Sequence, residues 1–251
     1  MFAGLKDAVA IITGAAGGMG IATVHRLARE KCKIFAVDIS EAALERMMDQ
    51  MTEEERTLIT TYVCNATSEE EVSAAVESCI KTYGSVSIMA NIAGIYTDCY
   101  FKDMTYSEWK RTMDVNVNSV LFFCRAVLPC MLANKHGKII NMASQAGVVG
   151  SVMHTHYAAS KAAIIGMSRS LAREVAEDGI NVNCIAPGII KTPMTARYTP
   201  QQVENFMSKI PMHRFGEADD VAKVIEFLAS DGSDYLTGQV FNVTGGWLLL
   251  S

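Results

Sequence analysis

The chain lacks the excess of basic residues with which nucleic-acid-binding proteins neutralise phosphates. It contains 22 lysines and arginines against 27 aspartates and glutamates, which gives a formal net charge of −5 and a sequence pI of about 5.6. A chain of this charge does not carry the positive field that attracts DNA or RNA. We therefore expect no nucleic-acid partner.

Cysteine pairs of the kind that bind zinc are also missing. The seven cysteines form an odd set without a C-x-x-C pair, and no histidines cluster with them at zinc-ligand spacing. His154 and His156 lie two positions apart with no carboxylate or thiolate beside them in the sequence to complete a metal site. This pattern is typical of a reducing compartment, so we expect reduced thiols and no bound metal.

Signals for export and for membrane insertion are absent as well. The first residues show no basic stretch followed by an apolar run and a small-residue cleavage site. The longest uncharged stretch, residues 139–160, is interrupted by polar side chains such as Asn141, Ser144 and His154. It is too polar to lie in hydrocarbon. We expect a cytoplasmic protein with no membrane partner.

The 251 residues are half hydrophobic and one fifth charged, which is enough apolar material for one large core or two small ones. No linker-like shift in composition, charge block or internal repeat divides them. We therefore expect a single domain over residues 1–251.

Short apolar runs alternate along the chain with longer segments of helical period. Strands are predicted over residues 9–13, 33–37, 58–63, 87–91, 137–142, 181–185 and 239–243, and the first two helices over residues 19–31 and 41–51. Each strand is a continuous apolar run, as expected for strands buried on both faces. The alternation predicts an α/β fold, a doubly wound and mainly parallel seven-stranded sheet with helices on both faces.

A glycine-rich segment, TGAAGGMG at residues 13–20, lies between the first predicted strand and the first predicted helix. Glycines there permit a tight turn and let the backbone approach a pyrophosphate at the helix N-terminus. An ordinary strand-to-helix turn is the alternative, but the position is the one that a dinucleotide site requires. We predict a Rossmann-type fold with the cofactor at Gly14, Gly18, Met19 and Gly20.

Asp38 closes the second predicted strand, and its carboxylate is placed to accept hydrogen bonds from the adenosine ribose hydroxyls. The same carboxylate would repel the 2′-phosphate of NADP, and neither Ile39 nor residues 15–17 offer a cation to bind it. The predicted cofactor is therefore NAD(H). Asp38 as a helix N-cap is the alternative, although Ser40 is the better-placed cap.

Tyr157 and Lys161 are spaced so that both side chains lie on one face of a helix. A tyrosine with a pKa near ~10 is a poor base at neutral pH, and a neighbouring ammonium favours its phenolate. A solvated helix face is the alternative for such a pair taken alone. With the glycine motif upstream, the pair indicates acid/base chemistry.

Together these motifs resemble those of the short-chain dehydrogenase/reductase family over essentially the whole chain. The resemblance rests on TGAAGGMG at 13–20, Asp38, NIAG at 91–94, Asn116 in VNVNS, Ser144 in NMASQ, YAASK at 157–161 and PGIIKTPM at 187–194. It implies that Tyr157 is the general acid/base, that Lys161 lowers its pKa and binds the nicotinamide ribose, and that Ser144 polarises the substrate oxygen. It adds Asn116, at a bend in its helix, as the fourth member that links Lys161 to solvent through a water.

The resemblance also implies further cofactor contacts, at small residues beside adenosine and in the turn beside the nicotinamide. The full set is Ile39, Asn65, Ala66, Asn91, Ala93, Gly94, Pro187, Gly188, Ile190, Thr192 and Met194, together with Tyr157 and Lys161. The family usually has Asp-Val at positions 65–66. We expect Asn65 to meet the adenine amino group through its amide oxygen instead.

Four residues are expected to line the substrate site: Tyr96, Gln145, His154 and Tyr198. Of the two histidines, we expect at least one to be a solvated loop residue. Periodicity breaks between residues 192 and 211, where only 201–208 has helical character, and we predict that this segment is a lid. Methionines in these segments could adapt to a bulky apolar ligand, with core packing as the alternative.

The predicted reaction is hydride transfer between NAD(H) and a secondary alcohol or ketone on a bulky or cyclic framework, such as a hydroxysteroid. The alternatives are reduction of a 3-oxoacyl-(acyl-carrier-protein) and oxidation of a sugar or polyol. A nucleotide-binding regulator without catalysis is the alternative from a different class. The resemblance further implies a homotetramer, with the apolar terminus at residues 247–250 buried at an interface.

Overall fold

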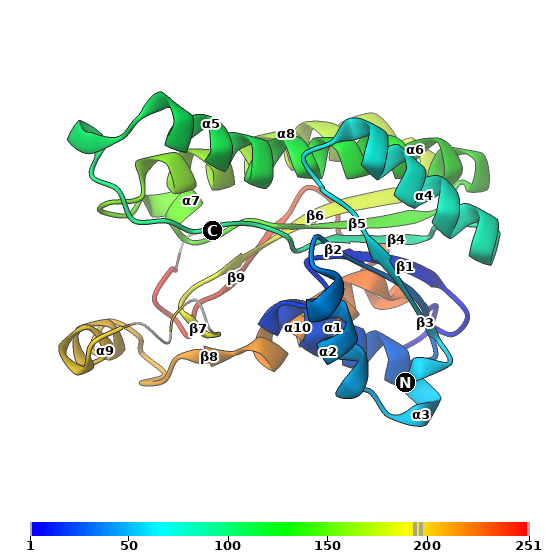
Figure 1. The fold of residues 1–251 in the computed structure, drawn as a ribbon, viewed down its shortest axis with the longest axis horizontal. Coiled ribbons are helices and arrows are strands. Elements are labelled where there is room, and N and C mark those ends of the chain that lie inside the picture. The colour runs from blue at the N-terminus through cyan, green and yellow to red at the C-terminus, as the bar shows by residue number, and fades with distance from the viewer. Residues whose placement is uncertain (1, 193–194, 196–197, 250–251) are drawn as a thin grey trace.

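The computed structural model describes residues 2–192, 195 and 198–249 (Figure 1). Seven parallel strands form one sheet in the order β3-β2-β1-β4-β5-β6-β9. Their bounds are β1 Val9–Thr13, β2 Lys33–Asp38, β3 Ile59–Val63, β4 Ile88–Asn91, β5 Gly137–Met142, β6 Ile180–Pro187 and β9 Val240–Val243. The order reverses beside β1, between β2 and β4, and ligands of such sheets bind at the carboxyl ends of the strands at this switch point.

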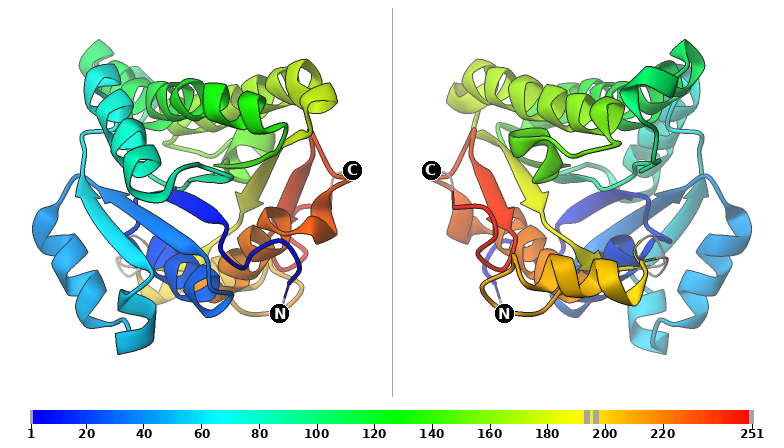
Figure 2. Two further views of the ribbon diagram at one scale, coloured as in Figure 1. Left: turned by 90° about the vertical axis from the view of Figure 1, so that its right-hand side faces the viewer. Right: turned by 90° about the vertical axis from the view of Figure 1, so that its left-hand side faces the viewer.

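Helices cover both faces of the sheet (Figures 1 and 2). One face carries α1 Gly18–Arg29, α2 Glu41–Asp49 and α10 Ala218–Ala229, and the other carries α4 Glu69–Tyr83, α6 Ser119–Asn134 and α8 Thr155–Val175. The fold class predicted from the sequence is confirmed.

The two cores of the protein follow from the alternation of side chains along the strands. In β1, Val9 and Ile11 pack with the α4, α6 and α8 side, whereas Ala10 and Ile12 pack with the α1, α2 and α10 side. Because successive side chains of a strand point to opposite faces, one apolar strand serves both cores. Strands from residue 9 to residue 243 therefore share one sheet.

Burial on both faces holds for the inner strands but not for the two edges. Every residue of β1, β4 and β5 is buried, whereas β3 alternates with exposed side chains and β9 is half-buried throughout. The expectation of full burial for all seven strands was thus wrong for β3 and β9. An edge strand has a neighbour on one side only, so its side chains are covered less completely.

Some helices and strands begin or end a few residues away from the bounds predicted from the sequence. The first helix ends at Arg29 rather than Lys31, because Lys31 adopts a left-handed backbone with φ of 65°. The sixth strand runs on to Pro187, two residues beyond its predicted end. The capping box predicted at Thr105 and Glu108 is present at the start of α5 Tyr106–Met113.

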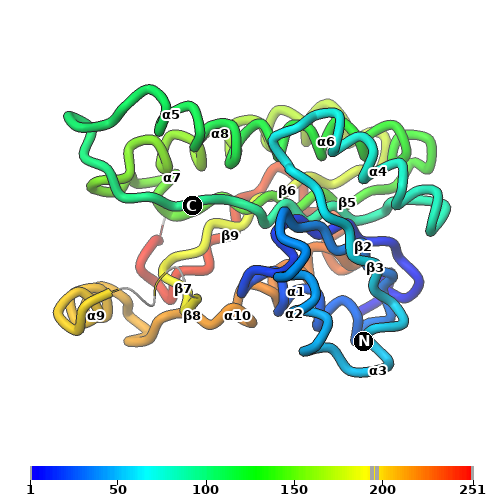
Figure 3. The backbone as a smooth tube through the Cα atoms, viewed as in Figure 1, coloured from blue at the N-terminus to red at the C-terminus, as the bar shows by residue number. Residues whose placement is uncertain are grey.

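The remaining elements are short. They are the helices α3 Glu53–Arg56, α7 Ala146–Val149 and α9 Pro200–Met207, the paired strands β7 Ile190–Lys191 and β8 Gly216–Glu217, a π-helical turn over Asp114–Asn118, and 3₁₀ turns over Phe101–Asp103, Ala176–Asp178 and Asp231–Ser233. Between β7 and β8 the chain makes an excursion that carries α9 away from the sheet (Figure 3). This excursion contains the segment predicted to be a lid.

One continuous helical run, residues 106–134, is long and apolar enough to cross a membrane by length and composition alone. In this structure its α6 part buries Val120, Phe123 and Val127 in the core beside the sheet. A core helix passes the same test of length and hydropathy as a membrane span. We attribute the apolar composition of α6 to this packing.

Candidate active site

The glycine-rich turn connects β1 to α1 at the switch point of the sheet. Gly14 has a φ of +62°, and a Cβ on Gly20 would lie 2.1 Å from the carbonyl oxygen of Gly14. Both positions therefore require glycine. Gly17 caps α1 without any side-chain hydrogen bond, so the first backbone N–H groups of the helix are not capped by a side chain. The turn fits a pyrophosphate at the positive end of α1.

Asp38 ends β2 directly beside this turn. Its two carboxylate oxygens accept hydrogen bonds from the backbone N–H groups of Ala16 and Ser40, each at 3.2 Å. The hydroxyl of Ser40, rather than Asp38, caps α2 by accepting from Ala43. Asp38 is thus held in the glycine turn, and its neighbour Ile39 is 69% exposed and uncharged.

Asn65 follows β3 on the same side of the sheet, but its amide oxygen is already engaged. That oxygen accepts from the backbone N–H of Thr67 at 3.1 Å and from the Thr67 hydroxyl at 2.8 Å. An amide oxygen has two lone pairs. The structure therefore speaks against the prediction that this oxygen meets the adenine amino group, because the side chain folds back on its own loop.

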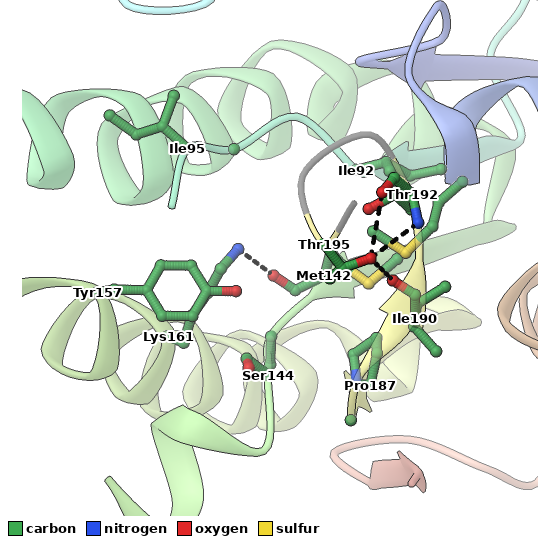
Figure 4. Close-up of a pocket in the computed structure, with 14 residues that line it drawn as sticks. Ile92, Ile95, Met142, Ser144, Tyr157, Lys161, Pro187, Ile190, Thr192 and Thr195 are labelled. Atoms are coloured by element: carbon green, nitrogen blue, oxygen red, sulfur yellow. Dashed lines mark hydrogen bonds between the residues drawn. The ribbon is translucent and has the colours of Figure 1, made fainter. Parts of the chain in front are cut away.

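Ser144, Tyr157 and Lys161 face one pocket (Figure 4). Ser144 follows β5, while Tyr157 and Lys161 lie one turn apart on α8. The pocket is lined by Met19, Ile92, Gly94, Ile95, Met142, Ala143, Ser144, Tyr157, Lys161, Pro187, Gly188, Ile190, Thr192 and Thr195. It contains three predicted catalytic residues and six of the other predicted cofactor residues, brought together from five separate parts of the chain.

Burial has the largest effect on the pKa values of Lys161 and Tyr157 in this pocket. Burial lowers the pKa of Lys161 to about 8, and its ammonium donates a hydrogen bond to the carbonyl oxygen of Met142 at 2.7 Å. Burial also raises the pKa of the Tyr157 hydroxyl above its usual value, and a hydrogen bond with Ser144 opposes that rise. The sequence predicted the opposite direction for Tyr157. Within the protein alone, desolvation of the phenolate outweighs the hydrogen bond with Ser144.

Asn116 lies in the π-helical turn between α5 and α6, where the family resemblance implied a bend. Its side-chain oxygen accepts from the backbone N–H of Ile95 at 2.8 Å, and its amide donates to the Ile95 carbonyl and to the Ser160 hydroxyl at 3.0 Å each. A Cβ on Gly94 would lie 3.2 Å from this side-chain oxygen and 3.4 Å from Lys161 Nζ. Asn116 thus holds the loop after β4 beside Lys161.

Other predicted cofactor residues lie outside the pocket. Asn91 is buried in the sheet, where it donates to Asn141 at 2.9 Å and steadies β4 against β5. Ala93 packs against the glycine turn, since a Cβ on Gly14 would lie 2.9 Å from its Cα. Met194 lies outside the described residues. The sequence missed Thr195, whose hydroxyl accepts from Thr192 N–H and donates to the Ile190 carbonyl.

The two histidines beside Tyr157 are both buried, so the expectation that at least one is solvated was wrong. His154 is 8% exposed and bonded through Nε2 to Asp98 and through Nδ1 to Ser151. His156 is fully buried and bonded through Nε2 to Thr97. The loop after β4 folds over both side chains, a long-range contact that local spacing does not reveal.

The other predicted substrate residues also lie near the site. The Tyr96 ring packs edge-on against the Tyr157 ring. Burial raises the pKa of Tyr96, and the nearby Tyr198 raises it further. Gln145 donates its backbone N–H to the Pro187 carbonyl. Its side-chain oxygen is buried without a hydrogen-bond partner in the described part of the chain.

Comparison with known proteins agrees with this architecture. The model of the family described as enoyl-(acyl carrier protein) reductase matches residues 14–248. The 3-oxoacyl-[acyl-carrier-protein] reductase FabG of Thermotoga maritima is 38% identical over 245 residues, which cover 98% of this chain and 99% of the relative. The FabG proteins of Haemophilus influenzae and Escherichia coli are 36% and 35% identical, covering 98% and 96% of this chain and 100% and 98% of the relatives.

A solved structure, that of gox2181, superposes with a TM-score of 0.91 at 33% identity and covers 96% of both chains. The glycine turn, the uncapped start of α1 and the pocket beside Tyr157 fit the nicotinamide dinucleotide that this class of oxidoreductase uses. The chain belongs to the short-chain dehydrogenase/reductase family and is an oxidoreductase acting on CH–OH groups.

Proposed function

We propose that the protein interconverts a 3-oxoacyl thioester and the corresponding 3-hydroxyacyl thioester with NAD(H). The substrate class is supported by the names of the FabG relatives, which match this chain over nearly its whole length. The hydroxysteroid favoured by the sequence gains no support from these relatives. The alternative that the sequence left open, a 3-oxoacyl substrate, takes its place.

The observation that carries the reaction is the convergence of Ser144, Tyr157 and Lys161 on one pocket. In the reducing direction the Tyr157 hydroxyl would donate its proton to the keto oxygen, and the Ser144 hydroxyl would hold that oxygen. The ammonium of Lys161 would stabilise the Tyr157 phenolate that results. The dinucleotide, when bound, supplies or accepts the hydride. In the oxidising direction the Tyr157 phenolate would accept the alcohol proton.

The choice of NAD(H) rests on Asp38. Its carboxylate lies at the end of β2, held by the N–H groups of Ala16 and Ser40, where the adenosine ribose of such a site sits. A 2′-phosphate at that position would meet this negative charge, with the apolar Ile39 next to it. We therefore propose that NADP(H) is the poorer cofactor.

The test is formation of the reduced cofactor, NADH or NADPH, at alkaline pH, with NAD⁺ and NADP⁺ run separately. Substrates are a 3-hydroxyacyl coenzyme A thioester, the same acyl group on acyl carrier protein, a hydroxysteroid and a polyol. Turnover of a thioester with NAD⁺ is the expected result. Turnover of the steroid or polyol alone would overturn the substrate class, and activity only with NADP⁺ would overturn the cofactor.

Two variants, each replacing a tyrosine by phenylalanine, test the assignment of Tyr157 as the acid/base. Tyr157→Phe should reduce turnover at least ~100-fold while NADH binding, followed by fluorescence, stays within about twofold. Tyr235→Phe removes a hydroxyl from a fully exposed ring and serves as the matched control. If wild-type protein binds NADH and turns over no substrate of the panel, the catalytically silent regulator is the better hypothesis.

We also propose that the protein is a homotetramer, as the family resemblance implies, and that it is located in the cytoplasm. At the C-terminal end of the described chain Leu249 is 85% exposed, a large apolar side chain suited to an interface between subunits. Sedimentation of wild-type protein and of Leu249→Ser tests this, because a tetramer that uses this end should weaken in the variant.

A further inference from the structure

The chain that leaves β6 forms one wall of the pocket that holds Ser144. The residues of this wall are Pro187, Gly188, Ile190, Thr192 and Thr195. Thr192 and Thr195 lie across the pocket from Tyr157 and Lys161 (Figure 4). A ligand that fills the pocket therefore contacts the catalytic residues on one side and this wall on the other.

The start of the wall is anchored to neighbouring strands. The Gly188 N–H donates to the Val243 carbonyl of β9 at 2.9 Å, and the Gly216 N–H of β8 donates to the Ile189 carbonyl at 2.9 Å. From Ile190 onward the chain continues as β7, which pairs with β8. The backbone groups of Ile190 therefore have a defined position in the wall of the pocket.

The end of the wall is held by a side chain, the hydroxyl of Thr195. That hydroxyl accepts a hydrogen bond from the Thr192 N–H at 3.1 Å and donates to the Ile190 carbonyl at 2.8 Å. Its oxygen also lies 3.1 Å from the Thr192 carbonyl, which accepts from the Thr195 backbone N–H at 3.0 Å. One side-chain hydroxyl thus occupies a backbone donor and a backbone acceptor of the wall.

A primary carboxamide is complementary to the same two backbone groups. Its oxygen accepts hydrogen bonds and its NH₂ group donates them, so it can pair with the Thr192 N–H and with the Ile190 carbonyl. The nicotinamide ring of the dinucleotide carries a carboxamide, and hydride transfer requires that this ring lie beside the substrate, at Ser144 and Tyr157. The nicotinamide end of the cofactor therefore belongs in this pocket, next to the wall.

We propose that the Thr195 hydroxyl competes with the nicotinamide carboxamide for the Ile190 carbonyl and the Thr192 N–H. Thr195 then sets how tightly the protein holds the nicotinamide half of the cofactor, whereas the glycine turn and Asp38 act on the other half. The inference goes beyond the proposed function, because it concerns the cofactor and is independent of the substrate.

The competition lowers the affinity for the cofactor because of the cost of unpaired backbone groups. Ile190 is buried, and a buried carbonyl without a hydrogen-bond partner costs free energy. The Thr195 hydroxyl removes that cost within the protein itself, so the carboxamide replaces one hydrogen bond by another and gains little at this carbonyl. A weaker hold also favours release of the cofactor, and release steps limit turnover in many enzymes.

The test compares NAD⁺ with ADP-ribose, which has the same adenosine and pyrophosphate but no nicotinamide. Calorimetric titration measures both affinities for wild type, Thr195→Val, Thr195→Ser and Thr195→Ala. Valine keeps the shape of threonine and removes the hydroxyl, serine keeps the hydroxyl, and alanine repeats the removal with a smaller side chain. Thr82→Val is the matched control, because the exposed Thr82 hydroxyl also donates to a backbone carbonyl, that of Ser78 at 2.8 Å on α4.

Thr195→Val and Thr195→Ala should bind NAD⁺ about 3- to 10-fold more tightly than wild type and ADP-ribose within about twofold of wild type. Thr195→Ser and Thr82→Val should bind both ligands as wild type does. Unchanged or weaker binding of NAD⁺ by the valine and alanine variants would overturn the proposal. Equal tightening of ADP-ribose would also overturn it, because the hydroxyl would then compete with the pyrophosphate. If wild type prefers NADP⁺, the ligands are NADP⁺ and 2′-phospho-ADP-ribose.

Hydrogen exchange at the Thr192 amide gives a second readout. In Thr195→Val this amide should exchange faster than in wild type, because its acceptor is removed. NAD⁺ should restore its protection in the variant and ADP-ribose should not, and a failure of NAD⁺ to do so would contradict the proposal. Neither measurement involves turnover. A wild type that reduces no 3-oxoacyl thioester would therefore refute the proposed function, while the comparison of NAD⁺ with ADP-ribose still decides the role of Thr195.

Discussion

The ammonium of Lys161 lies 5.7 Å from the centre of the Tyr157 ring and is held there by the carbonyl oxygen of Met142. Burial lowers the pKa of Lys161 from 10.5 to about 8. The unfolded chain therefore holds this proton more tightly than the folded protein does. Below pH 8 the buried charge opposes folding, and the penalty is relieved as the pH rises from about 8 toward 10.5.

Lys161→Met keeps the length of the side chain and removes the charge. Turnover should be lost, and the variant should be more resistant to urea relative to wild type at pH 7 than at pH 10.5. From the shift to about 8, we expect this stability difference to shrink by roughly 2 to 3 kcal/mol over that range. Urea unfolding of both proteins at several pH values measures it. A difference that stays constant with pH would contradict a depressed pKa at Lys161.

Asp38 and Ile39 should decide between the two nicotinamide cofactors. Wild type should bind NADH at least about tenfold more tightly than NADPH, because the Asp38 carboxylate repels a 2′-phosphate. Replacing both residues, Asp38→Ser with Ile39→Arg, should reverse the preference, since Ser keeps one acceptor for the glycine turn and Arg supplies the cation. Ile39→Gln is the uncharged control. Titration of NADH and NADPH fluorescence gives six affinities for the three proteins, and equal binding of both cofactors by wild type would refute the role of Asp38.

Arg26 joins the cofactor-binding helix to α10. Its guanidinium is bonded to Asp219 at 2.6 Å and to the buried Glu226 at 2.8 Å. Arg26→Met should lower the free energy of unfolding by about 3 kcal/mol, because Glu226 is then left buried without a partner. Adding Glu226→Gln should recover part of that loss in urea unfolding. Lys31→Met, which breaks an exposed ion pair with Glu54, should change stability by less than about 1 kcal/mol.

The same ion pair predicts the behaviour of the protein in acid. The hydrogen bond from Arg26 lowers the pKa of Asp219 to about 2, below its unfolded value of 3.8. A depressed carboxyl pKa stabilises the fold above pH 3.8 and loses that effect as the pH falls toward 2. Wild type should therefore lose more stability than Arg26→Met over this range. Equal losses would show that Asp219 does not depend on Arg26.

His156 should also lower the stability of the fold in acid, and this effect should begin at a higher pH than that of Asp219. Burial lowers the pKa of His156 below 6.5, so the unfolded chain takes up a proton that the folded protein resists. Stability from this group is present above pH 6.5 and falls as the pH drops below it. His156→Gln retains a polar partner for Thr97 and cannot titrate. Its midpoint of thermal unfolding should fall less between pH 7 and pH 5 than that of wild type.

Local sequence patterns predicted most of the fold and the residues at the centre of the candidate site. The alternation of apolar runs predicted all seven strands of the sheet, and the i, i+4 spacing predicted that Tyr157 and Lys161 share one face of a helix. The glycine-rich string between the first strand and the first helix predicted the turn, and the structure leaves no room for a side chain at Gly14 or Gly20. These features depend on neighbours a few residues away, so they can be read from the chain.

Features that depend on distant contacts were missed or misjudged. The sequence did not show that Asp98 would bind His154, 56 positions away, or that Thr97 would bind His156. It also gave Asn65 an open amide oxygen, which the loop itself occupies. The competing partners in these cases are set by how the loops fold over the sheet.

The sequence by itself determined the parallel sheet, the glycine-rich turn after the first strand and the shared helix face of Tyr157 and Lys161, because periodicity and residue spacing are properties of neighbouring residues. Only the tertiary structure decided the burial that sets the pKa directions of Tyr157 and Lys161. It also placed the Tyr96 ring edge-on against the Tyr157 ring. Desolvation and contacts between remote loops arise from the packing of the whole chain, and no local pattern encodes them.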